Sequence, residues 1–325
     1  MDRLIAIGEA LIDFIPHQIG LPIKDVQDFK AVVGGAPANV CAAFAKLGGK
    51  AALITQLGND AFGDKILKEL ARIGIGANMI SRTSEANTSL AFVSLVKNGH
   101  RDFSFYRNPA ADMLLSAEQI KPTFFCDAYA LHFCSVSLGN YPMKEAHRAA
   151  INMALNQGAI ISFDPNVRLP LWNDPESLLR TIREFIPFAH ILKISDEELE
   201  FITGFDTVEQ AKEILFCGNV KVVLLTKGAN GAEAHTRTSQ AIVTSHDIHA
   251  IDSTGAGDAF IGSFLYQLNR DKIDCKMLGT LNEKVLAKLL QYSNEYCEYS
   301  IQRNGATASY ATREEFEKYR LWYSE

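Results

Sequence analysis

Asp252-Ser253-Thr254-Gly255-Ala256-Gly257-Asp258 is a glycine-rich segment that runs directly into an apolar helical pattern. Its two glycines allow backbone N–H groups to turn towards one point, with no Cβ to keep an anion away. The start of the following helix adds unpaired N–H groups and the positive end of the helix dipole. The sequence therefore predicts that Gly255, Ala256 and Gly257 form an anion hole suited to a phosphate.

Asp258 lies at the mouth of this predicted anion hole. A carboxylate there would repel a bound phosphate unless it has a chemical role. We expect it to accept the proton of a substrate hydroxyl as that oxygen attacks a γ-phosphate. The alternative is a structural one, because Asp is favoured near helix N-termini without any chemistry.

The chain around this segment alternates between strand and helix patterns. Apolar runs that predict strands are separated by helical patterns, and they cover residues 128–133, 159–163, 191–194 and 221–226. Such alternation predicts an α/β fold with a mostly parallel central sheet flanked by helices. In such a sheet, ligands bind on the loops at the carboxyl ends of the strands.

One stretch departs from this alternation. Asn98-Gly99 separates two β-rich runs, 89–96 and 101–106, which is a strong hairpin signal. We expect this hairpin to form a small separate sheet with residues 13–29 and to cover a site on the larger part. The predicted division gives residues 1–12, 31–86 and 112–325 to an α/β core, and residues 13–30 and 87–111 to a β lid.

Bulk properties exclude several classes of protein. The 325 residues carry a net charge of -6, which disfavours non-specific nucleic-acid binding. The six cysteines form no C-x-x-C pair, which predicts free thiols in a reducing compartment rather than a zinc site. No apolar stretch approaches the about 20 residues that span a bilayer, and the N-terminus does not resemble a signal peptide. We therefore expect a cytoplasmic protein without nucleic-acid or membrane partners.

Two further motifs follow predicted strands. Gly34-Gly35-Ala36-Pro37-Ala38-Asn39 would bring backbone close to a polyhydroxy ligand, with the Asn39 amide as both donor and acceptor, although Gly-Gly alone is usually a turn. Asp164-Pro165-Asn166-Val167-Arg168 reads as a turn, and Arg168 is a candidate to hold developing phosphate charge.

These motifs together resemble a known family. D-x-T-G-A-G-D at 252–258 is similar to the C-terminal signature of the PfkB/ribokinase family of carbohydrate kinases, and G-G-x-x-x-N at 34–39 to its N-terminal signature. The resemblance runs from Gly8 to about Gly305, and the strings G-E-A-L-I-D-F-I-P and D-P-N-V-R-L-P-L-W are most similar to fructokinases. It implies a ribokinase-like fold with a β lid, and ATP-dependent phosphorylation of the 6-hydroxyl of D-fructose with Mg²⁺ and K⁺.

The resemblance also implies roles for individual residues. Asp258 would be the catalytic base, with Arg168 and the anion hole at the transferred phosphate. The residues implied at the sugar are Asp13, Gly34, Gly35, Asn39, Tyr106, Arg107 and Asp258. Those implied at the nucleotide are Lys193, Thr226, Lys227, Gly228, Gly255, Gly257 and Asn294. Glu198 would organise Mg²⁺ through water, and Asp252, Thr254 and Gly305 would bind the monovalent cation.

Two positions depart from the family pattern, and some alternatives stay open. Ser195 stands where the family most often has Asn, and Asn304 replaces a usual basic residue. A 2-keto-3-deoxygluconate kinase is the first alternative, because Arg107 and Arg168 would suit a substrate carboxylate; another sugar kinase or a catalytically silent sensor on the same fold follows. The sequence has neither a P-loop motif nor a G-x-G-x-x-G after its first strand. The lid would also allow a homodimer.

Overall fold

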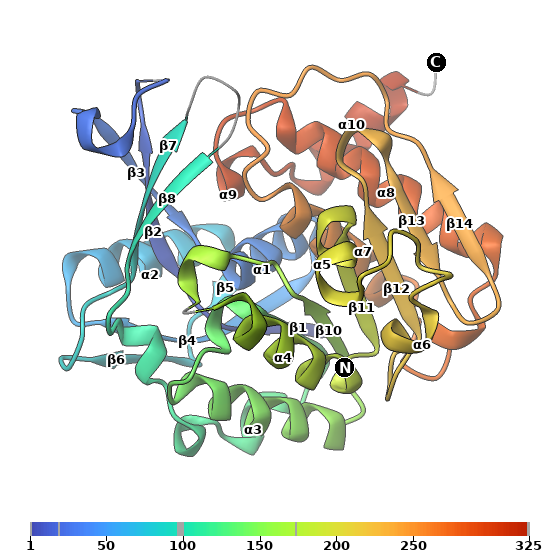
Figure 1. The fold of residues 1–325 in the computed structure, drawn as a ribbon, viewed down its shortest axis with the longest axis horizontal. Coiled ribbons are helices and arrows are strands. Elements are labelled where there is room, and N and C mark those ends of the chain that lie inside the picture. The colour runs from blue at the N-terminus through green and yellow to red at the C-terminus, as the bar shows by residue number, and fades with distance from the viewer. Residues whose placement is uncertain (1, 19, 96–100, 173, 324–325) are drawn as a thin grey trace.

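A large sheet separates two layers of helices in the computed structural model, which describes residues 2–18, 20–95, 101–172 and 174–323 (Figure 1). Neighbouring strands are parallel from β12 to β5, and β13 and β14 add an antiparallel end. In spatial order the strands are β14 (Gln240–Val243), β13 (Ala232–His235), β12 (Val222–Thr226), β11 (Ile191–Ser195), β10 (Ile160–Asp164), β9 (Ala128–Cys134), β1 (Arg3–Ile7), β4 (Lys50–Gly58) and β5 (Ile75–Gly76), with β6 (Ile80–Thr83) also paired to β4. The predicted mostly parallel sheet is confirmed.

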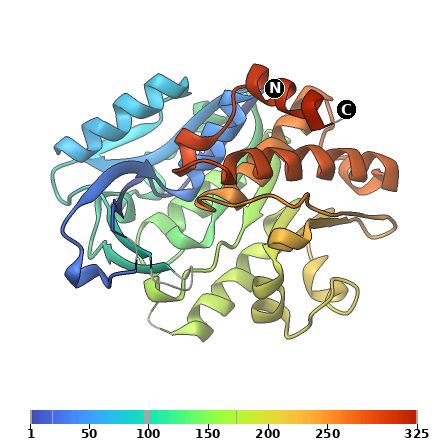
Figure 2. The same ribbon diagram turned by 90° about the horizontal axis from the view of Figure 1, so that it is seen from above.

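Alternate residues of the central strands enter two separate cores. On β1, Leu4 and Ala6 pack into one core, whereas Ile5 and Ile7 pack into the other. Such strands are apolar on both faces because helices cover both faces. One layer contains α1 (Ala36–Lys46), α2 (Ala61–Ile73), α7 (Ala256–Arg270), α8 (Glu283–Ile301), α9 (Ala306–Ser309) and α10 (Arg313–Tyr323). The other contains α3 (Met143–Asn156), α4 (Pro175–Phe185), α5 (Asp196–Thr203) and α6 (Lys212–Leu215), as Figure 2 shows from above.

A small second sheet stands to one side of these layers (Figure 1). Its order is β3 (Phe29–Gly34), β2 (Leu11–Pro16), β7 (Leu90–Leu95) and β8 (Arg101–Tyr106). The outer pairs are antiparallel and the central β2–β7 pair is parallel. Phe14 stacks on Phe92 at 4.6 Å between ring centroids and meets the edge of Phe62 on α2, which fixes this sheet against the main body.

The separate small sheet is confirmed, but its edges differ from the expectation. Residues 11–12 and 31–34 were expected in the core, whereas they lie in β2 and β3, because the antiparallel pairing of these strands continues to Leu11 and Gly34. The expected hairpin turn at residues 97–100 lies outside the described residues. The division of the chain into a core and a lid that act as separate units stays a prediction.

The topology brings several loops to one edge of the main sheet. β1, β10 and β11 are parallel to their neighbours and end at Ile7, Asp164 and Ser195, so their carboxyl ends lie at the same edge. Helices α1 and α7 pack closely against each other and begin at this edge. Within the described residues, no helix combines the length and the apolar character that crossing a membrane needs.

Candidate active site

The glycine-rich loop before α7 is held in place by Tyr310. Gly255 has a φ of 74°, in the left-handed region that favours glycine. The Tyr310 hydroxyl donates a hydrogen bond of 2.8 Å to the Gly255 carbonyl oxygen, and a Cβ on Gly255 would lie 2.4 Å from that hydroxyl. No side chain caps the start of α7, whose first residues are Ala256 and Gly257. The first-turn N–H groups of this helix are therefore suited to an anion, as predicted.

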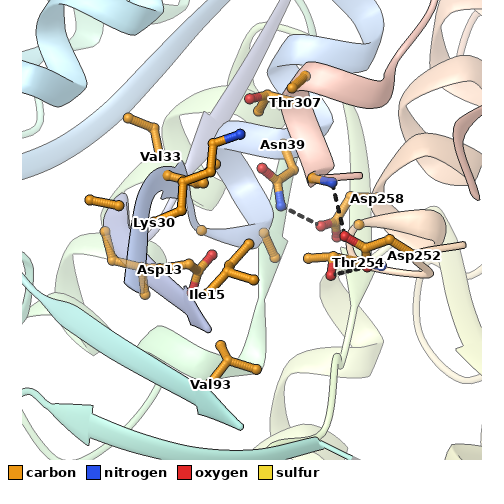
Figure 3. A pocket seen from close by; sticks show the side chains of 18 of the residues that line it. Asp13, Ile15, Lys30, Val33, Asn39, Val93, Asp252, Thr254, Asp258 and Thr307 are labelled. Carbon is orange, nitrogen blue, oxygen red and sulfur yellow. Dashed lines mark hydrogen bonds between the residues drawn. The ribbon is translucent and has the colours of Figure 1, made fainter. Parts of the chain in front are cut away.

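Asp258 and Asn39 meet at the starts of two helices that are far apart in sequence. The Asn39 Nδ2 atom donates a hydrogen bond of 2.9 Å to Asp258 Oδ2, and Figure 3 shows the two side chains pointing towards each other. Asp258 is only 7% exposed. Burial raises the pKa of Asp258 to about 7; the hydrogen bond from Asn39 opposes this shift and the nearby charge of Asp164 adds to it. The carboxyl group can therefore gain and lose a proton near neutral pH.

Asn39 has a second polar atom, Oδ1, which is buried without a hydrogen-bond partner among the described residues. A buried, unpaired amide oxygen costs free energy unless a ligand or water donates to it. Asn39 can therefore orient Asp258 through its amide nitrogen while its oxygen accepts a hydrogen bond from a ligand hydroxyl.

A cavity of about 1100 Å³ extends from Asp258 to the small sheet. Asp13 and Val93 reach it from β2 and β7, facing Asp258 across the space in Figure 3. Gly34 on β3 lies against Asp13, since a Cβ on Gly34 would be 2.0 Å from Asp13 Oδ2. Gly35 belongs to the same lining. The structure thus brings together the predicted sugar residues Asp13, Gly35, Asn39 and Asp258 around one cavity, with Gly34 in contact with Asp13.

The Asp252 carboxylate accepts hydrogen bonds from Thr254 and Gly305. Its Oδ1 atom accepts hydrogen bonds from the Thr254 backbone N–H at 2.9 Å and from the Thr254 hydroxyl at 2.6 Å. Its Oδ2 atom accepts from the Gly305 N–H at 2.9 Å. The three residues predicted for a monovalent cation are therefore adjacent, and they combine a carboxylate, a hydroxyl and backbone carbonyls. Hard cations prefer such oxygen ligands.

Glu198 is held differently from a direct metal ligand. Its Oε1 atom accepts from the Val167 N–H at 2.7 Å and its Oε2 atom from the Ser195 N–H at 2.9 Å. Both oxygens are engaged by protein, which fits the predicted contact with Mg²⁺ through water. No cluster of three or more His, Cys, Asp or Glu side chains suited to a metal occurs in the described ranges. Mg²⁺ retains its waters and needs few protein ligands, so the role of Glu198 at Mg²⁺ stays a prediction.

The charges of Arg168 and Lys193 both act on Asp258, but the two side chains have different surroundings. Arg168 is exposed, lines the cavity and donates to the Val167 carbonyl at 2.9 Å. Lys193 is buried, with its Nζ atom 3.0 Å from Asp164 Oδ2. It does not line the cavity, yet its Nζ atom would be 2.9 Å from a Cβ on Gly257. Lys193 therefore lies beside Gly257 and Asp164, outside the cavity lining.

The other predicted nucleotide residues lie near the end of β12, outside the cavity lining. The Ser245 hydroxyl donates to Asn294 Oδ1 at 3.2 Å and to the Gly228 carbonyl at 3.5 Å, which connects these two predicted residues. Lys227 pairs with Glu233. Thr226, which precedes it, donates its hydroxyl to the Ile194 carbonyl at 3.3 Å.

The small sheet presents different residues to the cavity from those predicted. Tyr106 is 64% exposed and packs against Phe92, whereas Phe105 lines the cavity. Successive side chains of a strand alternate between its faces, so the cavity face of β8 contains Phe105 and excludes Tyr106. Arg107 follows the strand and turns into the protein, where it pairs with Asp112 and does not line the cavity. In this structure neither Tyr106 nor Arg107 lies over the predicted sugar position.

Glu9 is a cavity residue to which the sequence analysis gave no role. It is 2% exposed and accepts hydrogen bonds from the Ser137 hydroxyl at 2.6 Å and from the Ala36 N–H at 3.2 Å. Burial raises the pKa of Glu9. Its only sequence signal is its place directly after Gly8 at the end of the first strand. Its bond to the first residue of α1 helps to fix the helix that carries Asn39.

Known proteins resemble this chain in sequence over almost its whole length. The model of the pfkB family carbohydrate kinases matches residues 1–313. Probable fructokinase-4 of Arabidopsis thaliana is 37% identical over 313 residues, which cover 96% of this chain and 94% of that protein. Fructokinase-2 of Solanum lycopersicum is 36% identical over 313 residues, with the same coverage of 96% and 94%.

Solved structures agree with the sequence comparisons. Fructokinase from Xylella fastidiosa with bound ATP superposes with a TM-score of 0.91 and 32% identity, over 99% of both chains. Fructokinase from Vibrio cholerae O395 with fructose, ADP and calcium gives a TM-score of 0.87 and 31% identity, over 98% of this chain and 99% of that one. The ribokinase-like fold is thereby confirmed, and this chain belongs to the pfkB family of carbohydrate kinases, which are phosphotransferases that act on a hydroxyl group.

Proposed function

We propose that this chain transfers the γ-phosphoryl group of ATP to the 6-hydroxyl of D-fructose, giving fructose 6-phosphate and ADP. The observation that carries the proposal is the buried Asp258 carboxyl group, which meets Asn39 beside the uncapped start of α7. Support for the sugar comes from relatives named fructokinase and from a related structure that holds fructose and ADP. Support for the nucleotide comes from a related structure with bound ATP.

The proposed reaction moves one proton and one phosphoryl group. The 6-hydroxyl gives its proton to Asp258 while its oxygen forms a bond to the γ-phosphorus. The bond from the γ-phosphorus to the β–γ bridging oxygen breaks, and its electron pair stays on ADP. The first-turn N–H groups of α7 and the Arg168 guanidinium stabilise charge on the transferred group. Mg²⁺ bound with ATP neutralises charge on the phosphate oxygens.

The roles proposed for ions and nucleotide follow from the same geometry. Glu198 would reach Mg²⁺ through water, because both of its oxygens are hydrogen-bonded to backbone. Asp252, Thr254 and Gly305 would surround K⁺ beside the catalytic loop. The adenine would lie near Gly228 and Asn294, which Ser245 connects.

A keto-acid substrate is less well supported by the structure. The sequence alternative, a 2-keto-3-deoxygluconate kinase, depends on Arg107 and Arg168 as partners of a carboxylate. Arg107 is already paired with the buried carboxylate of Asp112, and its side chain is 4% exposed. Of these two arginines, Arg168 alone lines the cavity, so one of the two partners that this alternative needs lies elsewhere. Lys30, Lys65, Lys68 and Arg72 also line the cavity, so the charge of the lining does not exclude a carboxylate, and the relatives named fructokinase carry the choice of sugar.

The proposed function is tested by ADP release with Mg-ATP against fructose, 2-keto-3-deoxygluconate, ribose and adenosine, with and without K⁺. We expect fructose to give the highest kcat/KM and K⁺ to raise it. A preference for the keto acid would refute the substrate, and equal rates without K⁺ would refute the cation site. If none of the four acceptors were phosphorylated, the proposed reaction with these substrates would be refuted.

The activity should depend on pH through Asp258. Only the ionised carboxylate accepts a proton, and burial raises the pKa of Asp258 to about 7. We expect kcat/KM to rise as pH increases from 5.5 and to level off above about 7.5, since this parameter reports groups of the free enzyme. In Asp164→Asn the midpoint should move to lower pH, because the charge of Asp164 raises this pKa. If the pH midpoint of kcat/KM were the same in Asp164→Asn as in the wild type, the titrating group would belong to a substrate and not to Asp258.

Gly34→Ala should weaken sugar binding. The added Cβ would lie 2.0 Å from Asp13 Oδ2, so the Asp13 carboxylate must leave its place in the cavity. Loss of a hydrogen bond to a charged group costs about 1.5–3 kcal/mol, so KM for fructose should rise about 10- to 100-fold with a smaller change in KM for ATP. Gly279→Ala is the matched control, because its Cβ would meet nothing closer than 3.6 Å. An unchanged KM for fructose in Gly34→Ala would exclude Asp13 from the sugar site.

Two wider properties are also proposed. The six cysteines are free in the structure, which supports a location in the reducing cytoplasm. β3 and β8 lie at the edges of the small sheet, and an edge strand can pair with another chain. This supports a homodimer through the lid.

A further inference from the structure

A second cavity, of about 560 Å³, lies behind the loop that carries Gly305. It is formed where α1 and α2 end and where the chain passes from α8 through α9 to α10. Three cations from separate elements line it, namely Lys46, Arg72 and Arg303. The carboxylate in its lining is Glu315. The lining is thus cationic in a chain whose net charge is -6.

Lys46 and Arg303 form no ion pair within the described part of the chain. The Lys46 Nζ atom donates to the Tyr310 carbonyl at 2.7 Å, and Arg303 donates to the Tyr299 carbonyl at 2.7 Å. The Arg303 guanidinium lies 3.6 Å from the centre of the Tyr299 ring, which holds it at the cavity wall. Arg72 differs, because Glu69 already pairs with it.

The nearby carboxylates compensate this positive charge only in part. Burial lowers the pKa of Lys46 and the charge of Arg72 lowers it further, whereas the charges of Glu315 and Glu69 oppose this shift. Hydrogen bonds from Thr312 lower the pKa of Glu315, and the charges of Lys46 and Arg303 lower it further; its Oε2 atom accepts from the Thr312 N–H at 2.7 Å and from the Thr312 hydroxyl at 2.8 Å. Lys46 and Arg303 have backbone carbonyls and no ion-paired carboxylate as partners within the described residues, so both can bind an anionic ligand.

We propose that this cavity binds the phosphate of a small phosphomonoester, with Lys46 and Arg303 as its partners. Arginine and lysine are the side chains that bind phosphate dianions. The cavity volume of about 560 Å³ is larger than a phosphate ion alone needs, because a water occupies about 30 Å³ in the liquid and a phosphate ion is only a few times larger. Ala45, Ile73 and Tyr299 supply an apolar wall for the carbon part of the ligand. A sugar phosphate has the required charge and size.

Tyr310 connects this cavity to the glycine-rich loop of residues 252–258, and Arg72 and Ala308 line both cavities. The carbonyl of Tyr310 accepts from Lys46, and its hydroxyl donates to the Gly255 carbonyl at 2.8 Å. A ligand that draws Lys46 to its phosphate changes the environment of the residue that holds the anion hole. Occupancy should therefore alter the rate of phosphoryl transfer. That consequence depends on the proposed function, whereas binding itself does not.

The binding is tested by titration calorimetry with glucose 6-phosphate, because fructose 6-phosphate would also enter the sugar cavity as the proposed product. We expect the wild type to bind it, and Lys46→Met and Arg303→Met each to weaken binding at least about tenfold. Lys284→Met is the matched control, since Lys284 is exposed at the start of α8 and does not line the cavity; it should bind as the wild type does. Circular dichroism at increasing temperature establishes that each variant is folded.

Three outcomes would overturn the inference. The first is no binding of glucose 6-phosphate to the wild type. The second is equal affinity in the wild type, Lys46→Met and Arg303→Met, which would place the ligand in the sugar cavity. The third is equal affinity for inorganic phosphate and glucose 6-phosphate at matched ionic strength, which would refute a site of sugar size. Each result is independent of catalytic turnover.

Discussion

Asp258→Asn should reduce kcat by about 10²- to 10⁴-fold, the contribution that a positioned general base makes to proton transfer. An amide cannot accept the proton of the attacking hydroxyl at neutral pH. It keeps the size of the side chain, and its oxygen still accepts the hydrogen bond that Asn39 Nδ2 now donates to Asp258. The change therefore removes the chemistry and leaves the position of Asn39 intact. The measurement is kcat for fructose by coupled ADP release.

A measurement of stability shows whether the fall in kcat of Asp258→Asn comes from the lost base or from unfolding. Burial raises the pKa of Asp258 from 3.8 to about 7, so the folded state holds its proton more tightly than the unfolded state does. The wild type consequently loses stability through this group as pH rises from about 4 to 7. Asn cannot ionise, so Asp258→Asn should be at least as stable as the wild type at pH 8. Asp206→Asn, at an exposed position, should change neither kcat nor stability. A near-normal kcat in Asp258→Asn would mean that another group is the base.

The fold could be predicted because its signals are local. Alternation of apolar runs with helical patterns indicated the mostly parallel sheet, and β1 shows why, since Leu4 and Ile5 are buried on opposite faces. Asn39 and Asp258 could also be anticipated as candidates, because each lies in the first turns of a helix that begins after a glycine. What the sequence did not contain is the hydrogen bond between them across 219 positions. That contact depends on the packing of α1 against α7.

At the small sheet, the structure places two predicted sugar residues, Tyr106 and Arg107, outside the cavity lining. Strand alternation placed Arg107 on the same face as Phe105, and Phe105 does reach the cavity. Arg107 does not, because the strand ends at Tyr106 and the buried carboxylate of Asp112 captures the guanidinium. The sequence does show a charged partner, Asp112, five residues after Arg107. Tertiary geometry decides whether the Arg107 guanidinium pairs with Asp112 or reaches the predicted sugar position.

Lys193→Met should destabilise the protein by about 3–5 kcal/mol, because it leaves a buried carboxylate without its partner. The Nζ atom of Lys193 lies 3.0 Å from Asp164 Oδ2, and the two side chains are 8% and 1% exposed. Burial disfavours the charged amine, yet Asp164 and Glu198 raise the pKa of Lys193 above its ordinary value. Methionine fills a similar volume without charge. The free energy of unfolding, measured by urea denaturation, reports the loss.

A double-mutant cycle distinguishes this ion pair from general damage to the core. Lys193→Met combined with Asp164→Asn removes both charges, so the double variant should recover most of the stability that Lys193→Met loses. Lys318→Met is the control, because it breaks an exposed pair with Glu314 and should leave stability unchanged. If the double variant were no more stable than Lys193→Met, the effect would come from packing.

Lys193 also lowers the pKa of Asp258, so in Lys193→Met the pH midpoint of kcat/KM should move upwards. This opposes the downward shift expected for Asp164→Asn, and the two shifts together would show that the buried pair adjusts the proton affinity of Asp258, which burial raises most.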